Sequence, residues 1–254
     1  MSDTPEYLSL GLDGGRIRPP FQLERVIGAT AKTFAANLLP FLFITTVIDA
    51  PAIVLNLMAL RDMRPGMMPN WPLFGVAFLT AMIGRFLIQG TLTFGVFQHL
   101  RGKPVKLGEC FVWGVRKAWT AFLTSLLVAL AVMAGFIACV IPGLYIFVIF
   151  SVSVPVAVVE GNGALAALTR SRQLTTGHGW PVFGVFVLFY VVVGVPSAII
   201  NILLANNFLA LAITSSVYQI FAVTIAAVLA CVVYYQLRES EEDLDTTELA
   251  AVFD

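Results

Sequence analysis

Two charged residues interrupt long apolar stretches of this sequence. Asp49 and Arg85 each lie well inside a run of mostly Leu, Ile, Val, Phe and Ala residues. A charged side chain at the centre of a bilayer costs about 2.5–3.5 kcal/mol, so such residues usually have a partner or a function. The two runs follow each other in the chain, and two antiparallel helices would bring both residues to one depth. We therefore predict an intramembrane polar pair formed by Asp49 and Arg85.

The predicted pair has two candidate roles and one alternative. It is either a structural ion pair or, together with Gln89, part of a polar path for a transported substrate. Alternatively, Asp49 caps a helix that breaks ahead of Pro51, and Arg85 then faces backbone carbonyls or water. Other polar residues in the apolar runs are interpreted as hydrogen-bonding contacts between helices; they include Ser215, Ser216 and Gln219.

A second group of residues has the chemistry to hold a phosphate. Arg170, Arg172, Arg116 and Lys117 lie in short segments next to apolar runs. The arginine guanidinium binds phosphate with two hydrogen bonds. All four basic residues are candidate contacts for lipid phosphates. Glu160 is expected to fold back onto Arg170 or Arg172. The alternative is that the four cations only orient the chain in the membrane and cap a helix.

The residues needed for several kinds of catalysis are missing from the sequence. The two histidines, His99 and His178, have no cysteine or acidic cluster at metal-ligand spacing. There is no Gly-x-Ser-x-Gly motif and no phosphate-binding glycine loop that ends in Lys-Ser or Lys-Thr. The net charge is zero, whereas a nucleic-acid-binding protein needs a basic excess. We therefore expect a non-enzymatic protein without a cofactor, a metal or a nucleic-acid partner. A membrane-embedded lipid enzyme is a further candidate, which the missing catalytic residues disfavour.

The elements that carry these residues are long and apolar. Hydrophobic residues make up 59% of the 254 residues and charged residues only 12%, about half the charged share of a soluble domain. A helix of about 20 apolar residues crosses the hydrocarbon core of a membrane. Ile141-Pro142-Gly143 is a turn signal that joins the third and fourth spans as a hairpin. The sequence predicts six spans, at 38–60, 73–97, 119–140, 144–159, 181–204 and 209–235.

The fold prediction is an all-α bundle, a polytopic integral membrane protein with a six-span domain over 20–238. Residues 1–19 are predicted to form a mobile N-terminal tail, and 239–254 an acidic C-terminal tail. Basic residues gather on one side of the spans, which places both termini in the cytoplasm. Helical spans favour a bacterial inner membrane, because outer-membrane proteins are barrels. The cytoplasmic side carries Arg16, Arg18, Arg25, Lys32, Arg101, Lys103, Lys106, Arg116, Lys117, Arg170, Arg172 and Arg238, and the other side only Arg61 and Arg64.

Three segments on the cytoplasmic side share a pattern. Residues 21–34, 105–119 and 163–180 each combine Arg or Lys with apolar residues, and a Pro or Trp stands near the membrane entry. This pattern predicts three cytoplasmic interfacial amphipathic helices, each followed by a helical hairpin, as copies of one unit. Alternatively, they are the basic linkers that any protein with this orientation has.

Short stretches between residues 21 and 240 carry a resemblance to a known family. They are Phe21-Gln-Leu-Glu-Arg-Val-Ile, Asn37-Leu-Leu-Pro-Phe41, Ile141-Pro-Gly-Leu144, Val154-Pro155, Val159-Glu160-Gly161, Ala166-Ala-Leu-Thr-Arg170-Ser171, Leu174-Thr-Thr-Gly177-His178 and Val233-Tyr-Tyr-Gln-Leu-Arg238. They resemble a bacterial family known for the membrane domain of glycerophosphodiester phosphodiesterases and for related stand-alone six-helix proteins. The resemblance implies the fold and the membrane location. The soluble catalytic domain of the larger relatives has no counterpart in the sequence, so their phosphodiesterase activity is not carried over.

The sequence therefore favours a lipid-interacting or partner-binding scaffold of the bacterial inner membrane. The expected partners are membrane phospholipids, with another membrane protein or a second copy of the chain as further candidates. The alternative is a small transporter or channel with a mid-membrane polar path at Asp49 and Arg85.

Overall fold

The computed structural model describes residues 22–61, 70–161 and 163–242, and these residues form helices and short turns with no strand among them. The expected N-terminal tail, 1–19, and residues 243–254 of the expected acidic tail lie outside this part of the chain. In chain order the helices are α1 (Leu23–Ala36), α2 (Leu38–Arg61), α3 (Trp71–Leu100), α4 (Leu107–Ala138), α5 (Val140–Phe150), α6 (Ser153–Glu160), α7 (Ala164–Thr175), α8 (Gly179–Leu203) and α9 (Phe208–Glu242).

Six segments of the structure are long and apolar enough to cross a membrane. The mean hydropathy of an 18-residue window in each lies between 1.7 and 2.4. The prediction of an all-α bundle with six segments of spanning length is therefore confirmed, and the chain is a multi-pass membrane protein. The segments are Leu38–Ala59, Trp71–Leu100, Leu107–Ala138, Val140–Glu160, Gly179–Leu203 and Ala210–Ser240.

Several helix boundaries differ from the sequence prediction. α2 runs unbroken through Pro51, so the alternative in which Asp49 caps a broken helix is wrong. Neighbouring helices and local adjustments make such a proline tolerable in a membrane helix. α4 begins at Leu107, so the interfacial helix expected over 105–119 and the third span are one continuous helix. The fourth span is divided into α5 and α6, because Pro155 lacks an amide hydrogen and fits only the first turn of a helix.

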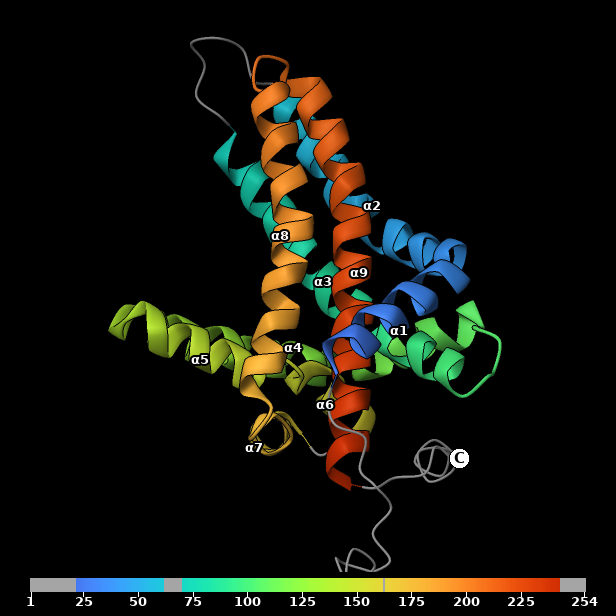
Figure 1. Ribbon diagram of the computed structural model, residues 1–254. Coiled ribbons are helices and arrows are strands. Elements are labelled where there is room, and N and C mark those ends of the chain that lie inside the picture. Colours follow the sequence, from blue (N-terminus) through green and yellow to red (C-terminus); the bar gives the residue numbers. More distant parts are fainter. Residues whose placement is uncertain (1–21, 62–69, 162, 243–254) are drawn as a thin grey trace, which may run out of the picture.

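Two directions of helices are visible in the bundle (Figure 1). α3, α8, α9 and the C-terminal part of α2 run along the long axis of the molecule, whereas the hairpin of α4 and α5 lies across them. The end that carries the α8–α9 turn is called the distal end below. The other end, with Arg170, Arg172 and Arg238 on α7 and α9, is called the basic end.

The α4–α5 hairpin turns at Cys139, whose extended backbone links the two helices. The predicted turn at Ile141-Pro142-Gly143 is therefore displaced, and Pro142 lies in the first turn of α5, where its missing amide hydrogen costs nothing. The two helices touch closely beside the turn, because a Cβ built on Gly135 would lie 2.9 Å from the Cα atom of Gly143. Glycines at such contacts let membrane helices pack backbone against backbone.

The hydrophobic core lies toward the basic end, around the C-terminal half of α9. Tyr234 and Leu237 of α9 are fully buried there. α9 contacts α1, α2, α3, α6, α7 and α8. Farther along α9, the hydroxyl groups of Thr45 and Thr224 form a hydrogen bond of 2.9 Å between α2 and α9. Lipid tails are as apolar as the core, so close packing and such hydrogen bonds hold membrane helices together.

Candidate functional site

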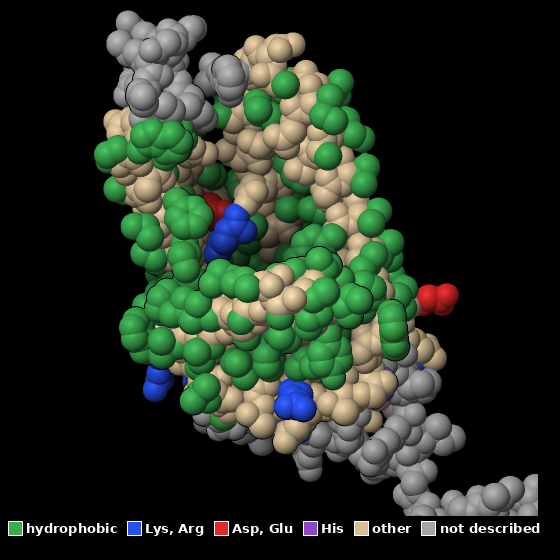
Figure 2. Space-filling model, turned by 90° about the vertical axis from the view of Figure 1, so that its left-hand side faces the viewer, with side chains coloured by type: hydrophobic (Ala, Val, Ile, Leu, Met, Phe, Trp, Pro, Cys, Tyr) green, Lys and Arg blue, Asp and Glu red, His purple; other side chains and the backbone are tan. Residues whose placement is uncertain are grey.

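A cavity of about 360 Å³ lies between α2, α3 and α9, on the distal side of the core. Its volume falls in the range of small-molecule binding sites. Figure 2 shows the molecule hollowed above the α4–α5 hairpin, with basic and acidic side chains inside the hollow. The cavity thus opens on a lateral face of the bundle, which faces lipid in a membrane-spanning protein. It is lined by Asp49, Ala52, Ile53, Asn56, Phe74, Ala77, Phe78, Ala81, Arg85, Ser215, Ser216 and Gln219.

Asp49 is buried in the middle of α2, with 7% of its surface exposed. Gly84 of α3 makes room for it, because a Cβ on Gly84 would lie 3.2 Å from the Asp49 Oδ1 atom. At a rise of about 1.5 Å per residue, Asp49 lies about 16 Å along α2 from Leu38. Asp49 therefore lies near the middle of α2, away from both ends of the helix.

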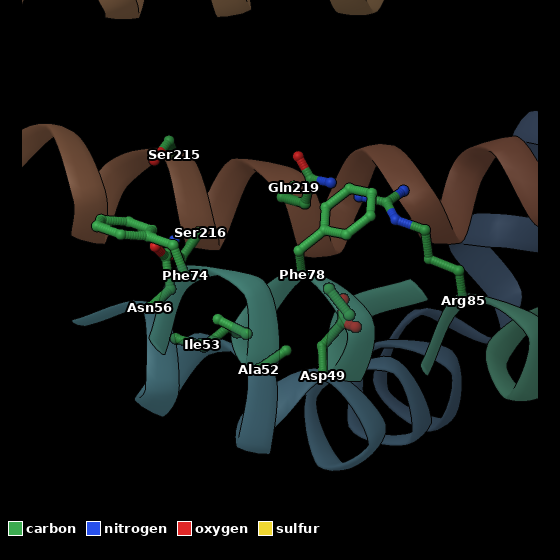
Figure 3. A pocket seen from close by; sticks show the side chains of 12 residues that line it. Asp49, Ala52, Ile53, Asn56, Phe74, Phe78, Arg85, Ser215, Ser216 and Gln219 are labelled. Atoms are coloured by element: carbon green, nitrogen blue, oxygen red, sulfur yellow. The ribbon is translucent and has the colours of Figure 1, made fainter. Parts of the chain in front are cut away.

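Arg85 lies on α3, and its side chain is exposed in the cavity. Figure 3 shows the guanidinium reaching toward α9 and Gln219, whereas the Asp49 carboxylate stays between α2 and α3. The two charges are close enough for a Coulombic attraction. Within the described part of the chain, however, neither side chain takes part in an ion pair or a hydrogen bond. The structure brings the two predicted residues to one cavity without joining them, because the Arg85 side chain extends toward another helix.

Gln89, the third residue of the predicted polar path, lies outside the cavity. It is half-buried one helical turn after Arg85 and is absent from the cavity lining. Gln219 of α9 lines the cavity instead, and its side chain is exposed there. The polar path was predicted from residues of α2 and α3 alone. In the structure, the amide beside Asp49 and Arg85 comes from α9.

Three further polar residues line the cavity, and sequence reasoning missed their role. Ser215 and Ser216 were interpreted as contacts between helices, but both hydroxyls donate to the Ala212 carbonyl of their own helix, at 3.2 and 2.7 Å. Asn56 was not singled out. It follows Asp49 by seven residues, and this spacing of two helical turns is the signal that places both on one helix face.

The four candidate phosphate contacts have different surroundings at the basic end. Arg170 is paired with Glu160, with 3.6 Å between Nε and Oε1, which confirms that Glu160 folds back onto α7. The Lys117 ammonium lies 5.4 Å from the centre of a tryptophan ring of its own helix. Arg116 and Arg172 are exposed. The structure therefore places Arg170 in an internal contact and leaves Arg116 and Arg172 at the surface.

Glu160 belongs to a network that ties three helices together. The Tyr234 hydroxyl of α9 donates to Glu160 Oε1 at 3.0 Å, and Arg238 Nη1 donates to the Tyr234 oxygen at 3.3 Å. Arg170 of α7 approaches the same Glu160 oxygen. Charge-assisted bonds of this kind are about twice as strong as neutral ones, so the network stabilises the contact of α6 with α7 and α9.

A second cavity, of about 640 Å³, lies between α5, the α7–α8 turn and the start of α8. Its walls are mainly apolar, and the described residues that line it include no charged one. Tyr145 and Trp180 at its edge are 67% and 84% exposed, as is typical of aromatic residues at a membrane interface. This groove lacks charged groups that could select a ligand headgroup, so the Asp49/Arg85 cavity is the stronger candidate site.

Within residues 22–61, 70–161 and 163–242, no group of three or more His, Cys, Asp or Glu residues is placed to hold a metal ion. Comparisons of the chain with protein-family models, curated proteins and solved structures found no match. The resemblance to the membrane domain of glycerophosphodiester phosphodiesterases therefore stays a prediction.

Proposed function

We propose that this multi-pass membrane protein is a non-enzymatic lipid-binding module that holds a membrane lipid in the Asp49/Arg85 cavity. The observation that carries the proposal is Arg85, whose guanidinium is exposed inside the bundle with no ion-pair or hydrogen-bond partner among the described residues. A charge at mid-membrane costs about 2.5–3.5 kcal/mol. A lipid phosphate that accepts two hydrogen bonds from the guanidinium offsets much of this cost.

The shape of the cavity favours a lipid over a water-soluble ligand. The hollow opens on the lateral face of the bundle (Figure 2). Its polar residues are accompanied by apolar ones, among them Phe74, Phe78 and Ile53. A lipid can place its headgroup at Arg85 and keep its acyl chains against these apolar walls and the surrounding bilayer.

The cations of the basic end indicate which side of the membrane this end of the proposed protein faces. We place it in a bacterial inner membrane with the basic end and both termini toward the cytoplasm, because cytoplasmic segments are enriched in Lys and Arg. Arg116 and Arg172 are exposed. In this orientation they contact the phosphates of the inner leaflet, whose anionic lipids attract basic residues.

Transport of the bound molecule is a second candidate function, and the depth of the site favours it. Asp49 lies near the middle of α2, and transporters bind their substrates near the bilayer midplane. Proteoliposomes with fluorescent phospholipid separate the two functions. Protein-dependent movement of the lipid between leaflets, abolished by Arg85→Gln, identifies a transporter. Lipid binding without movement identifies the binding module.

Lipid retention during purification tests the proposed function. Wild-type protein, Arg85→Gln, Arg85→Lys and Gln89→Ala are extracted in a mild detergent, and the co-purified phospholipid is counted by mass spectrometry. We expect Arg85→Gln to lose the retained lipid, Arg85→Lys to keep part of it, and Gln89→Ala to match the wild type, because Gln89 lies outside the cavity. Equal retention by Arg85→Gln and Gln89→Ala would refute the proposal.

A further inference from the structure

Among the described residues that line the Asp49/Arg85 cavity, there is one carboxylate, one guanidinium and no other charged group. As described above, the two groups form no ion pair and neither has a hydrogen-bond partner among the described residues. The charges of the lining therefore cancel while both groups stay available to a ligand. This arrangement differs from a purely basic phosphate site.

We propose that the cavity recognises a zwitterionic headgroup, in which an ammonium group binds Asp49 and a phosphate or carboxylate binds Arg85. The inference rests on the proposed function, because it names the class of lipid held at the same site. A headgroup with one amine and one phosphate, such as that of phosphatidylethanolamine, presents both charges on a short linker.

The surroundings of the two charges argue against a singly charged ligand. An anion bound to Arg85 would leave the Asp49 carboxylate, which is 7% exposed, without a partner and would repel it. A cation bound to Asp49 would leave the Arg85 guanidinium alone inside the bundle. A charge without a partner inside a membrane is costly, so only a ligand with both charges satisfies the two residues together.

Two side-chain amides add neutral hydrogen-bonding groups to the site. Asn56 of α2 and Gln219 of α9 line the cavity, and neither side chain has a hydrogen-bond partner among the described residues. Figure 3 shows Gln219 on the side of the guanidinium. An amide offers both donors and an acceptor, so Gln219 can donate to a phosphate oxygen that also accepts from Arg85.

A lipid and a free zwitterion, such as an amino acid, share this chemistry. The lateral opening of the hollow (Figure 2) and the Phe74 and Phe78 walls favour the lipid as the source. A free zwitterion would reach the cavity from water and would gain nothing from these apolar walls.

A competition experiment tests the proposal. Detergent-purified wild-type protein is exchanged with an equimolar mixture of phosphatidylethanolamine and phosphatidylglycerol of the same acyl chains, and bound lipids are counted by native mass spectrometry. We expect a preference for phosphatidylethanolamine of roughly tenfold, the size of one charge-assisted hydrogen bond. Asp49→Asn is expected to reduce this ratio to about one, Arg85→Gln to remove binding of both lipids, and Gln89→Ala to change neither.

Ligands altered at the amine keep the test valid if Asp49→Asn does not fold. N-acetylated phosphatidylethanolamine has no positive charge, so its binding to the wild-type protein is expected to fall to the level of phosphatidylglycerol. Equal or stronger binding of phosphatidylglycerol, or an unchanged ratio in Asp49→Asn, would overturn the zwitterion inference and leave lipid binding standing. Retention of neither lipid by the wild-type protein would instead overturn the proposed function. Displacement of the lipid by equimolar glycerophosphoethanolamine would show that the cavity selects a free zwitterion and not a lipid.

Discussion

At the scale of single residues, Gly114 allows α3 and α4 to cross in close contact. A Cβ built on Gly114 would overlap the Oγ1 atom of Thr91 and would lie 3.0 Å from the Cα atom of that residue. Gly90 of α3 faces the same contact, where its own Cβ would lie 3.4 Å from the Gly114 carbonyl oxygen. Because part of the obstacle at Gly114 is backbone, rotation of a side chain cannot relieve it. The contact therefore depends on the absence of a side chain at Gly114.

Gly114→Ala is expected to lower the free energy of unfolding by about 1–3 kcal/mol, the usual cost of overpacking. The midpoint of thermal unfolding in detergent measures this effect. Gly108→Ala is the matched control, because it lies on the same helix and its added Cβ would meet nothing within 4 Å. Gly114 lies in the helix interior and Gly108 in the first turn, so Gly114→Ala gains the larger helix propensity, which works against the expected loss. Equal melting temperatures of the two variants would show that α3 and α4 do not cross at Gly114.

The sequence predicted that Asp49 and Arg85 lie at one level of two neighbouring helices, and the structure places both residues on one cavity. Residue counting supports such a prediction, because a helix rises by a fixed distance per residue. The direction of the Arg85 side chain was not predictable in the same way. It points toward α9 (Figure 3), a helix far away in the sequence whose position depends on the packing of the whole bundle.

At the scale of helices, the hydrophobic pattern predicted the lengths of the spans but not their directions. Apolar stretches at 119–140 and 144–159 indicated a hairpin, and α4 with α5 and α6 forms one. Figure 1 shows that α4 and α5 lie across the other long helices. Apolar length permits a span without fixing its tilt, which is set by neighbouring helices. The chain enters and leaves such a hairpin on the same side of the membrane. The predicted side of the termini is therefore the same whether or not the hairpin spans the membrane.

Labelling of Cys139 is expected to distinguish a hairpin that lies in the membrane from one that stands upright. Cys139 is exposed at the hairpin turn, whereas Cys110 and Cys231 are buried. Figure 1 shows α4 and α5 across the other long helices, and this arrangement would place the turn in the hydrocarbon. Maleimides react with the thiolate, which hardly forms in apolar surroundings, so we expect permeant and impermeant maleimides alike to leave Cys139 unlabelled in intact membranes. A Cys110→Ser/Cys231→Ser variant is the control, and its Cys139 must be labelled after denaturation. Labelling by a membrane-impermeant maleimide from the distal side would show that the hairpin spans the membrane.

At the scale of the whole molecule, the filled core and the open cavity occupy different parts of the bundle. Tyr234 and Leu237 lie in the core toward the basic end, and the Glu160 network stabilises that end. The cavity lies farther toward the distal end and opens sideways (Figure 2). A closely packed half next to a hollow half is a suitable frame for binding a ligand from the surrounding lipid.

An experimental structure of the protein in lipid nanodiscs, with an antibody fragment bound to increase its mass, tests lipid binding in the lateral cavity most directly. We predict non-protein density that contacts the Arg85 guanidinium and continues out of the cavity into the surrounding lipid. A cavity that contains only water, or one that is closed by a direct ion pair between Arg85 and Asp49, would contradict the account.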